Sequence, residues 1–172
     1  NVFKFYGKPE RIMIKQKLEE VRALIKESAE SVGRKYEDVT LVAVTKTHGA
    51  DVINEAIKCG VTDIGENKVQ EILEKYDDVL PVRWHLIGHL QTNKVKYIID
   101  KVCMIHSVDS VHLMDEIERS AIKKGIPAMD ILIEVNISGE ESKFGVRPDE
   151  VDTLLSHAAE LERVKVKGLM TI

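Results

Sequence analysis

The sequence predicts an α/β protein with the fold of a TIM-type (β/α)8 barrel. About six of the βα repeats are present in this chain, and an extra helix precedes them. Two observations predict this class. Short apolar runs alternate regularly with amphipathic helical patterns, which is typical of βαβ units and a parallel sheet. Polar residues follow the end of each apolar run in turn, as expected at a barrel mouth where every loop contributes to one site.

An open, doubly wound sheet is the competing architecture. No GxGxxG motif follows the first predicted strand, which disfavours a dinucleotide-binding sheet. A complete barrel typically takes about 250 residues, and this chain has 172. We therefore favour the barrel and expect it either to be completed by a second chain or to belong to a deliberately altered protein.

Composition narrows the possible partners. A net charge of -4 with 44% hydrophobic residues indicates a globular chain and gives no general electrostatic basis for binding nucleic acid or an anionic membrane. No apolar run is long enough to span a bilayer and residues 1–17 lack the apolar core of a signal peptide, so we expect a cytoplasmic protein. Cys59 and Cys103 are isolated, so we expect two buried, reduced thiols and no metal site.

The predicted elements begin after a tail at residues 1–10, and residues 11–172 form one partial barrel domain. From Arg11 onward, apolar residues recur at helical spacing, and Gly33 offers a C-terminal stop for this first helix. The helix has one apolar face to bury. Strands are predicted at 40–45, 62–65, 82–87, 102–106, 129–136 and 165–171, and the helices between them at 51–58, 68–76, 91–99, 110–124 and 148–161.

The segment 41–49 contains the first predicted strand and a lysine. Its four consecutive apolar residues fit a strand that is buried on both faces, and Lys46 then lies at the carboxyl end, where α/β folds bind ligands. An amine attacks a carbonyl group only when it is unprotonated, and a lysine that closes a buried strand is expected to be desolvated. The alternative is a solvated loop lysine.

Polar residues also follow the second and third strands. Asn67 ends the second strand, where it lines a pocket or caps the helix that starts at Lys68, and we place Glu66 in solvent. We expect His85 to point into the barrel as a hydrogen-bonded core histidine. Its spacing from His89 invites a metal site, but the two residues span a strand end and no carboxylate follows His85 as in a zinc-binding helix, so we assign no metal ligand.

The fifth strand carries a charge in an apolar run. Glu134 and Asn136 share one face, and we predict that Glu134 points into the barrel and pairs with a lysine, Lys46 being one candidate. The alternative is an edge strand with Glu134 in water. A loop rich in turn-forming residues follows and contains Lys143. Met170 ends the last predicted strand, where it either borders a ligand or only packs in the core.

Together the motifs LVAVTKT, DIGEN, WHLIGHLQTNK, HSVD, VNISGEESKFG and KGLMTI resemble the pyridoxal phosphate homeostasis protein family, whose fold is similar to the barrel domain of alanine racemase. The resemblance covers residues 11–172. It implies that Lys46 forms an internal aldimine with pyridoxal 5'-phosphate. It also implies that Lys143 belongs to a loop near the mouth and that the phosphate-binding groups follow Ile172 in sequence. The candidate cofactor-binding residues are Lys46, Asn67, His85, Asn136, Lys143 and Met170, with no catalytic residue.

The function expected from this resemblance is to hold the cofactor for intracellular homeostasis without catalytic turnover. Expected partners are pyridoxal 5'-phosphate, apo forms of pyridoxal-phosphate-dependent enzymes, and a second chain that completes the barrel. Three alternatives stay open: an amino-acid racemase-like enzyme, an aldolase that uses a Schiff-base lysine without a cofactor, and a barrel fragment inactive without its remaining part.

Overall fold

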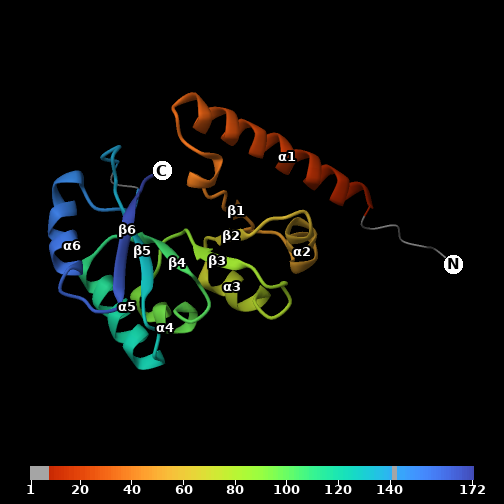
Figure 1. The fold of residues 1–172 in the computed structure, drawn as a ribbon. Helices are drawn as coiled ribbons and strands as arrows, with labels where there is room; N and C mark the ends of the chain where they lie inside the picture. Colours follow the sequence, from red (N-terminus) through yellow and green to blue (C-terminus); the bar gives the residue numbers. More distant parts are fainter. Residues whose placement is uncertain (1–7, 141–142) are drawn as a thin grey trace.

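A computed structural model describes residues 8–140 and 143–172, and its centre is a six-stranded parallel sheet (Figure 1). The strands lie in the order β1-β2-β3-β4-β5-β6, so each pairs with its neighbour in sequence and the order never reverses. Successive right-handed crossovers of this kind place the connecting helices on one face, as in a barrel wall. The strands are β1 (Ala43–Val44), β2 (Asp63–Glu66), β3 (Arg83–Leu86), β4 (Met104–Val108), β5 (Met129–Glu134) and β6 (Val164–Met170).

The helices confirm the predicted alternation. Each predicted helix has a counterpart, and two of them begin with a turn of 3-10 helix. Gly33 and Gly125 follow two of the helices with φ of 73° and 68°, the left-handed conformation that a helix end favours and that glycine adopts without strain. The helices are α1 (Lys8–Ser31), α2 (Ala50–Lys58), α3 (Val69–Lys75), α4 (Val95–Ile98), α5 (Val111–Lys124) and α6 (Val151–Ala158), with 3-10 turns η1 (Tyr36–Asp38), η2 (Thr92–Lys94) and η3 (Pro148–Glu150).

The core lies between the sheet and its helices. Alternate strand residues such as Ile64, Leu86 and Ile131 are fully buried on the face that the helices cover. The residues between them, including Asp63 and His85, therefore point to the opposite, concave face of the sheet. This alternation puts polar side chains inside the barrel wall while the helices pack on apolar side chains.

The strand β1 is shorter and more exposed than predicted. It contains two residues, lies at the edge of the sheet next to β2, and leaves Val44 51% exposed. The prediction of a strand buried on both faces is therefore wrong for β1, because in the part of the chain that the structure describes only β2 pairs with it.

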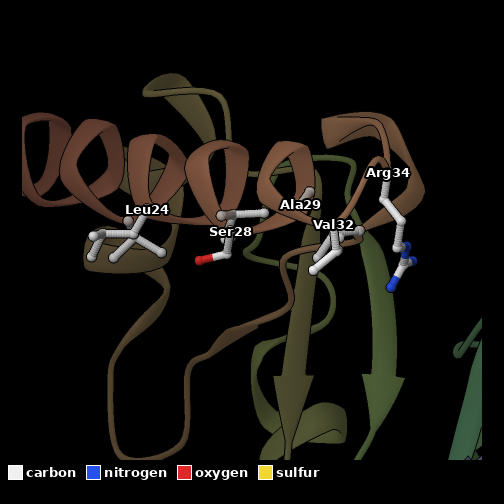
Figure 2. Close-up of a pocket in the computed structure, with 8 residues that line it drawn as sticks. Leu24, Ser28, Ala29, Val32 and Arg34 are labelled. Atoms are coloured by element: carbon white, nitrogen blue, oxygen red, sulfur yellow. The ribbon is translucent and has the colours of Figure 1, made fainter.

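The helix α1 buries only part of its apolar face. It begins at Lys8, three residues before the predicted domain boundary, and residues 1–7 lie outside the described residues. Leu18 and Ala29 are buried, whereas Leu24 and Val32 are 62% and 71% exposed. Figure 2 shows these last two side chains in a groove of about 370 Å³ along the helix. A second apolar cavity, of about 460 Å³, separates α1 from β1 and α2.

The two cysteines are free, but neither is buried as predicted. Cys59 is half-buried and Cys103 is exposed, because each lies in a connection beside a strand rather than in the core. None of the helices in the described ranges has the length and apolar character that a membrane crossing requires.

Candidate functional site

The candidate site lies at the carboxyl ends of the strands, where the chain turns from each strand toward the next helix. Because all six strands are parallel, these turns meet at one edge of the sheet. Lys46 follows β1, Asn67 follows β2 and Asn136 follows β5. The sequence thus predicts correctly which edge collects these side chains.

Lys46 lies on a tight turn between β1 and α2. Its side chain is exposed, so the predicted desolvation of the amine is not observed; the edge position of β1 and its early end explain the exposure. The next residue, Thr47, has φ of 67°, the left-handed conformation that a β-branched residue rarely adopts. Such a conformation persists only where the surroundings impose it.

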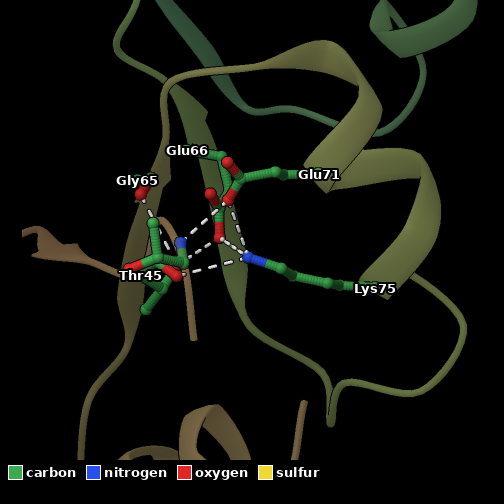
Figure 3. A network of polar contacts seen from close by, with 6 residues as sticks. Thr45, Gly65, Glu66, Glu71 and Lys75 are labelled. Carbon is green, nitrogen blue, oxygen red and sulfur yellow. Dashed lines mark hydrogen bonds and ion pairs between the residues drawn. The ribbon is translucent and has the colours of Figure 1, made fainter. Parts of the chain in front are cut away.

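A polar network from β2 and α3 surrounds this turn (Figure 3). The hydroxyl of Thr45 donates to Glu66 Oε1 at 2.7 Å, and Lys75 Nζ donates to the carbonyl oxygen of Thr45 at 3.3 Å. The backbone N–H of Thr47 donates to Glu71 Oε2 at 3.1 Å. Both neighbours of Lys46 are therefore held, while the lysine side chain itself extends into solvent.

Two carboxylates share one ammonium group within this network. Lys75 Nζ lies 2.9 Å from both Glu66 Oε1 and Glu71 Oε2. Burial raises the pKa of Glu66 despite hydrogen bonds from Lys75 and Thr45, whereas the hydrogen bond from Lys75 lowers the pKa of Glu71 to about 2. Burial alone would lower the pKa of Lys75, but the hydrogen bonds to Glu66 and Glu71 outweigh it and raise this pKa.

This network is not predicted from the sequence. The prediction that Glu66 faces solvent is wrong, because its side chain is fully buried on the helix-covered face of β2. Glu71 and Lys75 are four residues apart on α3, the spacing at which opposite charges pair on a helix. That spacing, shortly after a glutamate at the end of a predicted strand, was the available signal.

Asn67 is half-buried immediately after β2. The residue at the N-cap of α3 is Lys68, without a side-chain capping bond, so the capping alternative for Asn67 is not observed. A Cβ atom on Gly88 would collide with the backbone carbonyl oxygen of Asn67, so glycine is required there for the turns after β2 and β3 to touch. The buried hydroxyl of Ser107 donates to the carbonyl oxygen of Gly88 at 2.6 Å and ties the turn after β3 to β4.

His85 is a hydrogen-bonded core histidine, as predicted. Its Nε2 lies 2.9 Å from Asp63 Oδ1 and its Nδ1 lies 2.9 Å from His106 Nε2. A carboxylate oxygen only accepts, so His85 Nε2 carries a proton. Cys103 Sγ also lies 3.4 Å from this nitrogen, and Asp63 accepts two further hydrogen bonds, both at 2.8 Å, from Arg83.

The polar cluster formed by Asp63, Arg83, His85 and His106 contains two groups with shifted pKa values. Burial alone would raise the pKa of Asp63, but hydrogen bonds from Arg83 and other neighbours lower it to about 2. Burial and the neighbouring His85 lower the pKa of His106 to about 4. The contacts with Asp63 and His106 occupy both ring nitrogens of His85 on the concave face. Among the described residues, no group of three or more histidine, cysteine or acidic side chains is arranged to hold a metal ion.

Glu134 points away from the helices, as predicted, but the predicted lysine partner is wrong. Its side chain is 9% exposed, and within the described ranges its Oε2 has no hydrogen-bond partner and no lysine pairs with it. Burial and the nearby Asp109 raise its pKa. A cavity of about 220 Å³ adjoins it and is lined by Glu134, Val135, Asn136, Lys143, Phe144 and Ile172.

The loop after β5 is organised by Asn136. Its Oδ1 accepts from the backbone N–H of Gly139 at 3.0 Å, and its Nδ2 donates to the carbonyl oxygen of Glu140 at 2.8 Å. Lys143 Nζ pairs with Glu140 Oε1 at 3.0 Å, and residues 141 and 142 of this loop lie outside the described residues. Phe144 stacks on His89 with ring centroids 4.1 Å apart, which joins this loop to the turn after β3.

Met170 ends β6 and is half-buried. Its carbonyl oxygen accepts a hydrogen bond of 2.8 Å from the N–H of Val135, so its backbone is tied to the residue that follows β5. Trp84, which we expected to serve packing, is buried on the other face and lies against Tyr76 at 5.7 Å between ring centroids. The structure thus places Asn136 and Lys143 around one cavity, which Met170 does not line, while Lys46 lies apart after β1.

Comparison with known proteins assigns the fold and site to a class. Residues 17–172 match the family model described as the alanine racemase, N-terminal domain. A relative from Aquifex aeolicus, named pyridoxal phosphate homeostasis protein, is 46% identical over 91% of this chain and 69% of its own length. The chain therefore belongs to the pyridoxal phosphate homeostasis protein family, within the alanine racemase N-terminal domain fold.

Two solved structures agree with this assignment. A protein of unknown function from Bifidobacterium adolescentis has a TM-score of 0.88 at 34% identity and covers 96% of this chain and 72% of its own. PipY from Synechococcus elongatus, solved with PLP bound, has a TM-score of 0.78 at 31% identity and covers 92% of this chain and 70% of its own. These similarities confirm the predicted α/β fold and family.

Proposed function

We propose that this chain binds pyridoxal 5'-phosphate through the amine of Lys46 and acts in homeostasis of this cofactor. The main support is the primary amine of Lys46 at the carboxyl end of β1. Hydrogen bonds hold the residues on either side of it, Thr45 and Thr47. The name of the 46% identical relative and the PLP-bound structure of PipY support the choice of cofactor. When bound, the cofactor supplies an aldehyde that condenses reversibly with a primary amine.

Lys46 fits this group because it provides an amine that solvent reaches. At the same edge of the sheet but with three strands in between, Glu134, whose Oε2 has no partner among the described residues, and Lys143 line a separate cavity. We assign Asn67, Lys143 and Met170 to the border of the bound cofactor. His85 and Asn136 act indirectly, His85 by tying β2 to β4 and Asn136 by ordering the loop that carries Lys143. This division is supported by their hydrogen bonds, which are made to protein groups.

We infer that the chain holds the cofactor without turning over a substrate. Proton transfer in an amino-acid enzyme needs an acid or base that is free to reach the substrate. His85 uses both ring nitrogens within the protein, and Glu71 and Lys75 are paired with each other. An optical assay with L-alanine tests this inference: we expect no racemisation by the cofactor-loaded chain, and Lys46-dependent racemisation would refute it.

The proposed partners are apo enzymes that use the cofactor and a second chain that completes the barrel. Residues 11–172 would then act as one partial barrel domain, with α1 already starting at Lys8, inside the predicted tail. The apolar face of α1 and the edge strand β1 support a polypeptide partner, since exposed apolar patches and unpaired strand edges favour association. The chain covers 69% of the length of the Aquifex relative, so the unmatched part of that relative is a specific candidate.

This candidate can be tested with a dye whose fluorescence reports exposed apolar surface. Addition of the unmatched polypeptide should reduce the fluorescence, and unchanged fluorescence would refute this partner. Release of cofactor to an apo enzyme is tested separately, by recovery of the recipient's activity on mixing with the loaded chain. Recovery no faster than with an equal amount of free cofactor would count against a carrier role.

The cofactor proposal is tested by absorbance after dialysis with pyridoxal 5'-phosphate. Wild type should retain a visible band, Lys46→Ala should lose it, and Lys123→Ala, which removes an exposed lysine on α5, should keep it. Mass spectrometry after borohydride reduction should locate the label on Lys46. An equal band in Lys46→Ala would refute the assignment, and labelling without added cofactor by a simple carbonyl compound would favour the aldolase alternative.

A further inference from the structure

The turn that carries Lys46 is held by side chains from a different helix. Lys75 of α3 donates to the carbonyl oxygen of Thr45, and Glu71 of the same helix accepts from the N–H of Thr47 (Figure 3). The two contacts lie on either side of Lys46. We propose that Glu66, Glu71 and Lys75 form a positioning clamp that fixes the backbone of Lys46 for attachment of its amine to the cofactor; this rests on the function proposed above.

The geometry of the ammonium group supports a clamp. Lys75 Nζ has three hydrogens to donate and three oxygens within reach, at 2.9 Å on Glu66, 2.9 Å on Glu71 and 3.3 Å on Thr45. Its side chain is 12% exposed, so water does not readily replace these partners. The ammonium is saturated by the network, which leaves Lys46 as the amine that extends from the turn.

The conformation of Thr47 gives a second reason. A β-branched residue with φ of 67° is strained, which costs free energy of folding. The hydrogen bond from its N–H to Glu71 offsets that cost. Without the clamp we expect Thr47 to relax to negative φ, which would redirect the peptide that joins it to Lys46.

Glu66 anchors the network to the sheet. It is fully buried on β2, accepts from the Thr45 hydroxyl and from Lys75, and has an Oε2 with no partner among the described residues. A buried carboxyl with one oxygen orphaned contributes little to stability on its own. Its position is better explained by the two groups that it orients, Thr45 and Lys75.

A positioning role predicts that loss of the clamp slows one reaction of the Lys46 amine and not another. The pyridoxal phosphate reaction depends on the direction in which Lys46 leaves the turn, whereas acetylation by a small activated ester depends only on access to the exposed amine. In Lys75→Met we expect the rate constant for cofactor attachment to fall by roughly ten- to a hundredfold, the effect of slight misplacement of a reacting group. Acetylation of Lys46, measured relative to Lys123 in the same sample, should change less than twofold by comparison.

Three further variants complete the experiment. Lys75→Arg keeps donors and charge and should recover most of the attachment rate. Glu71→Ala removes the contact to Thr47 but leaves the buried pair, so it tests the clamp even if Lys75→Met fails to fold by circular dichroism. The matched control is Lys124→Met, which breaks an ion pair of 2.8 Å between the end of α5 and Asp100. It should leave the rates of cofactor attachment and of acetylation unchanged.

The outcomes separate the two proposals. If wild type forms no Lys46-bound product after borohydride reduction, the proposed function and the clamp both fail. If wild type forms the product and the Lys75 and Glu71 variants form it equally fast, only the clamp is refuted. Equal slowing of attachment and acetylation would also refute the clamp, because it would show a loss of access to the amine.

Discussion

Replacement of Asp63 by asparagine should reveal how much the polar cluster on the concave face stabilises the fold. Asp63 is almost fully buried at the start of β2 and accepts two hydrogen bonds from Arg83 and one from His85. Its pKa falls from an ordinary value of 3.8 to about 2 in the folded chain. A difference of 1.8 pH units, at 1.36 kcal/mol for each, corresponds to about 2 kcal/mol of stability.

The sign follows from proton binding. Below pH 3.8 the unfolded chain protonates Asp63 before the folded chain does, so acid favours unfolding. The contribution of Asp63 is complete above pH 3.8 and is lost as the pH falls toward 2. Asp63→Asn cannot take up this proton, so the difference in stability between wild type and variant should shrink over the same window.

Urea denaturation at a series of pH values measures this difference. We expect wild type to exceed Asp63→Asn by about 2 kcal/mol at pH 7 and by clearly less at pH 3. Asp77→Asn, which changes an exposed aspartate, serves as the control and should follow wild type throughout. A difference between wild type and Asp63→Asn that stays constant from pH 7 to pH 3 would show that the carboxylate charge does not stabilise the cluster.

Two further predictions concern pH and a set of hydrogen bonds. The pKa of His106 is lowered from 6.5 to about 4, so the unfolded chain binds this proton first as the pH falls. Between pH 6.5 and 4 wild type should lose up to about 1.4 kcal/mol of stability for each pH unit, and His106→Gln should reduce this slope in the same urea titration. The Glu118 carboxylate accepts from the backbone N–H groups of Glu162, Arg163 and Val164, at 3.1, 2.8 and 3.0 Å. Glu118→Ala should therefore cost about 3–5 kcal/mol in urea denaturation, and a loss no larger than that of the exposed Glu160→Ala would contradict this view.

The sequence predicts the order and type of the elements because their signals are local. Periodicity defines α5, and its ends follow from single residues: the Ser110 hydroxyl accepts from the N–H of Leu113, and Gly125 ends the helix. The sequence also predicts Lys46 at a strand end, since the apolar run and the turn lie side by side in the chain. It does not predict that β1 is exposed, because that depends on which strands pair with it.

The polar clusters could not be predicted because they depend on register between strands. Asp63 and Arg83 are the first residues of β2 and β3 and lie directly opposite each other, but a one-residue slip would turn one of them to the other face. The absence of a lysine partner for Glu134 has a similar cause. Lys46 follows β1 and Glu134 ends β5; three strands of the described sheet separate β1 from β5, and sequence spacing does not report that separation.

The same strand β2 carries both clusters, on opposite faces. Asp63 and Glu66 are three residues apart, an odd number, so Asp63 joins His85 on the concave face and Glu66 joins Lys75 on the helix-covered face. The two clusters should therefore respond independently to substitution. Asp63→Asn is expected to change the pH dependence of unfolding without slowing attachment at Lys46. Glu71→Ala is expected to slow attachment and, because the pKa of Glu71 is lowered from 4.5 to about 2, to make its own change in acid unfolding, which should add to that of Asp63→Asn. Coupling between the two measurements in the double variant would show that β2 transmits strain from one face to the other.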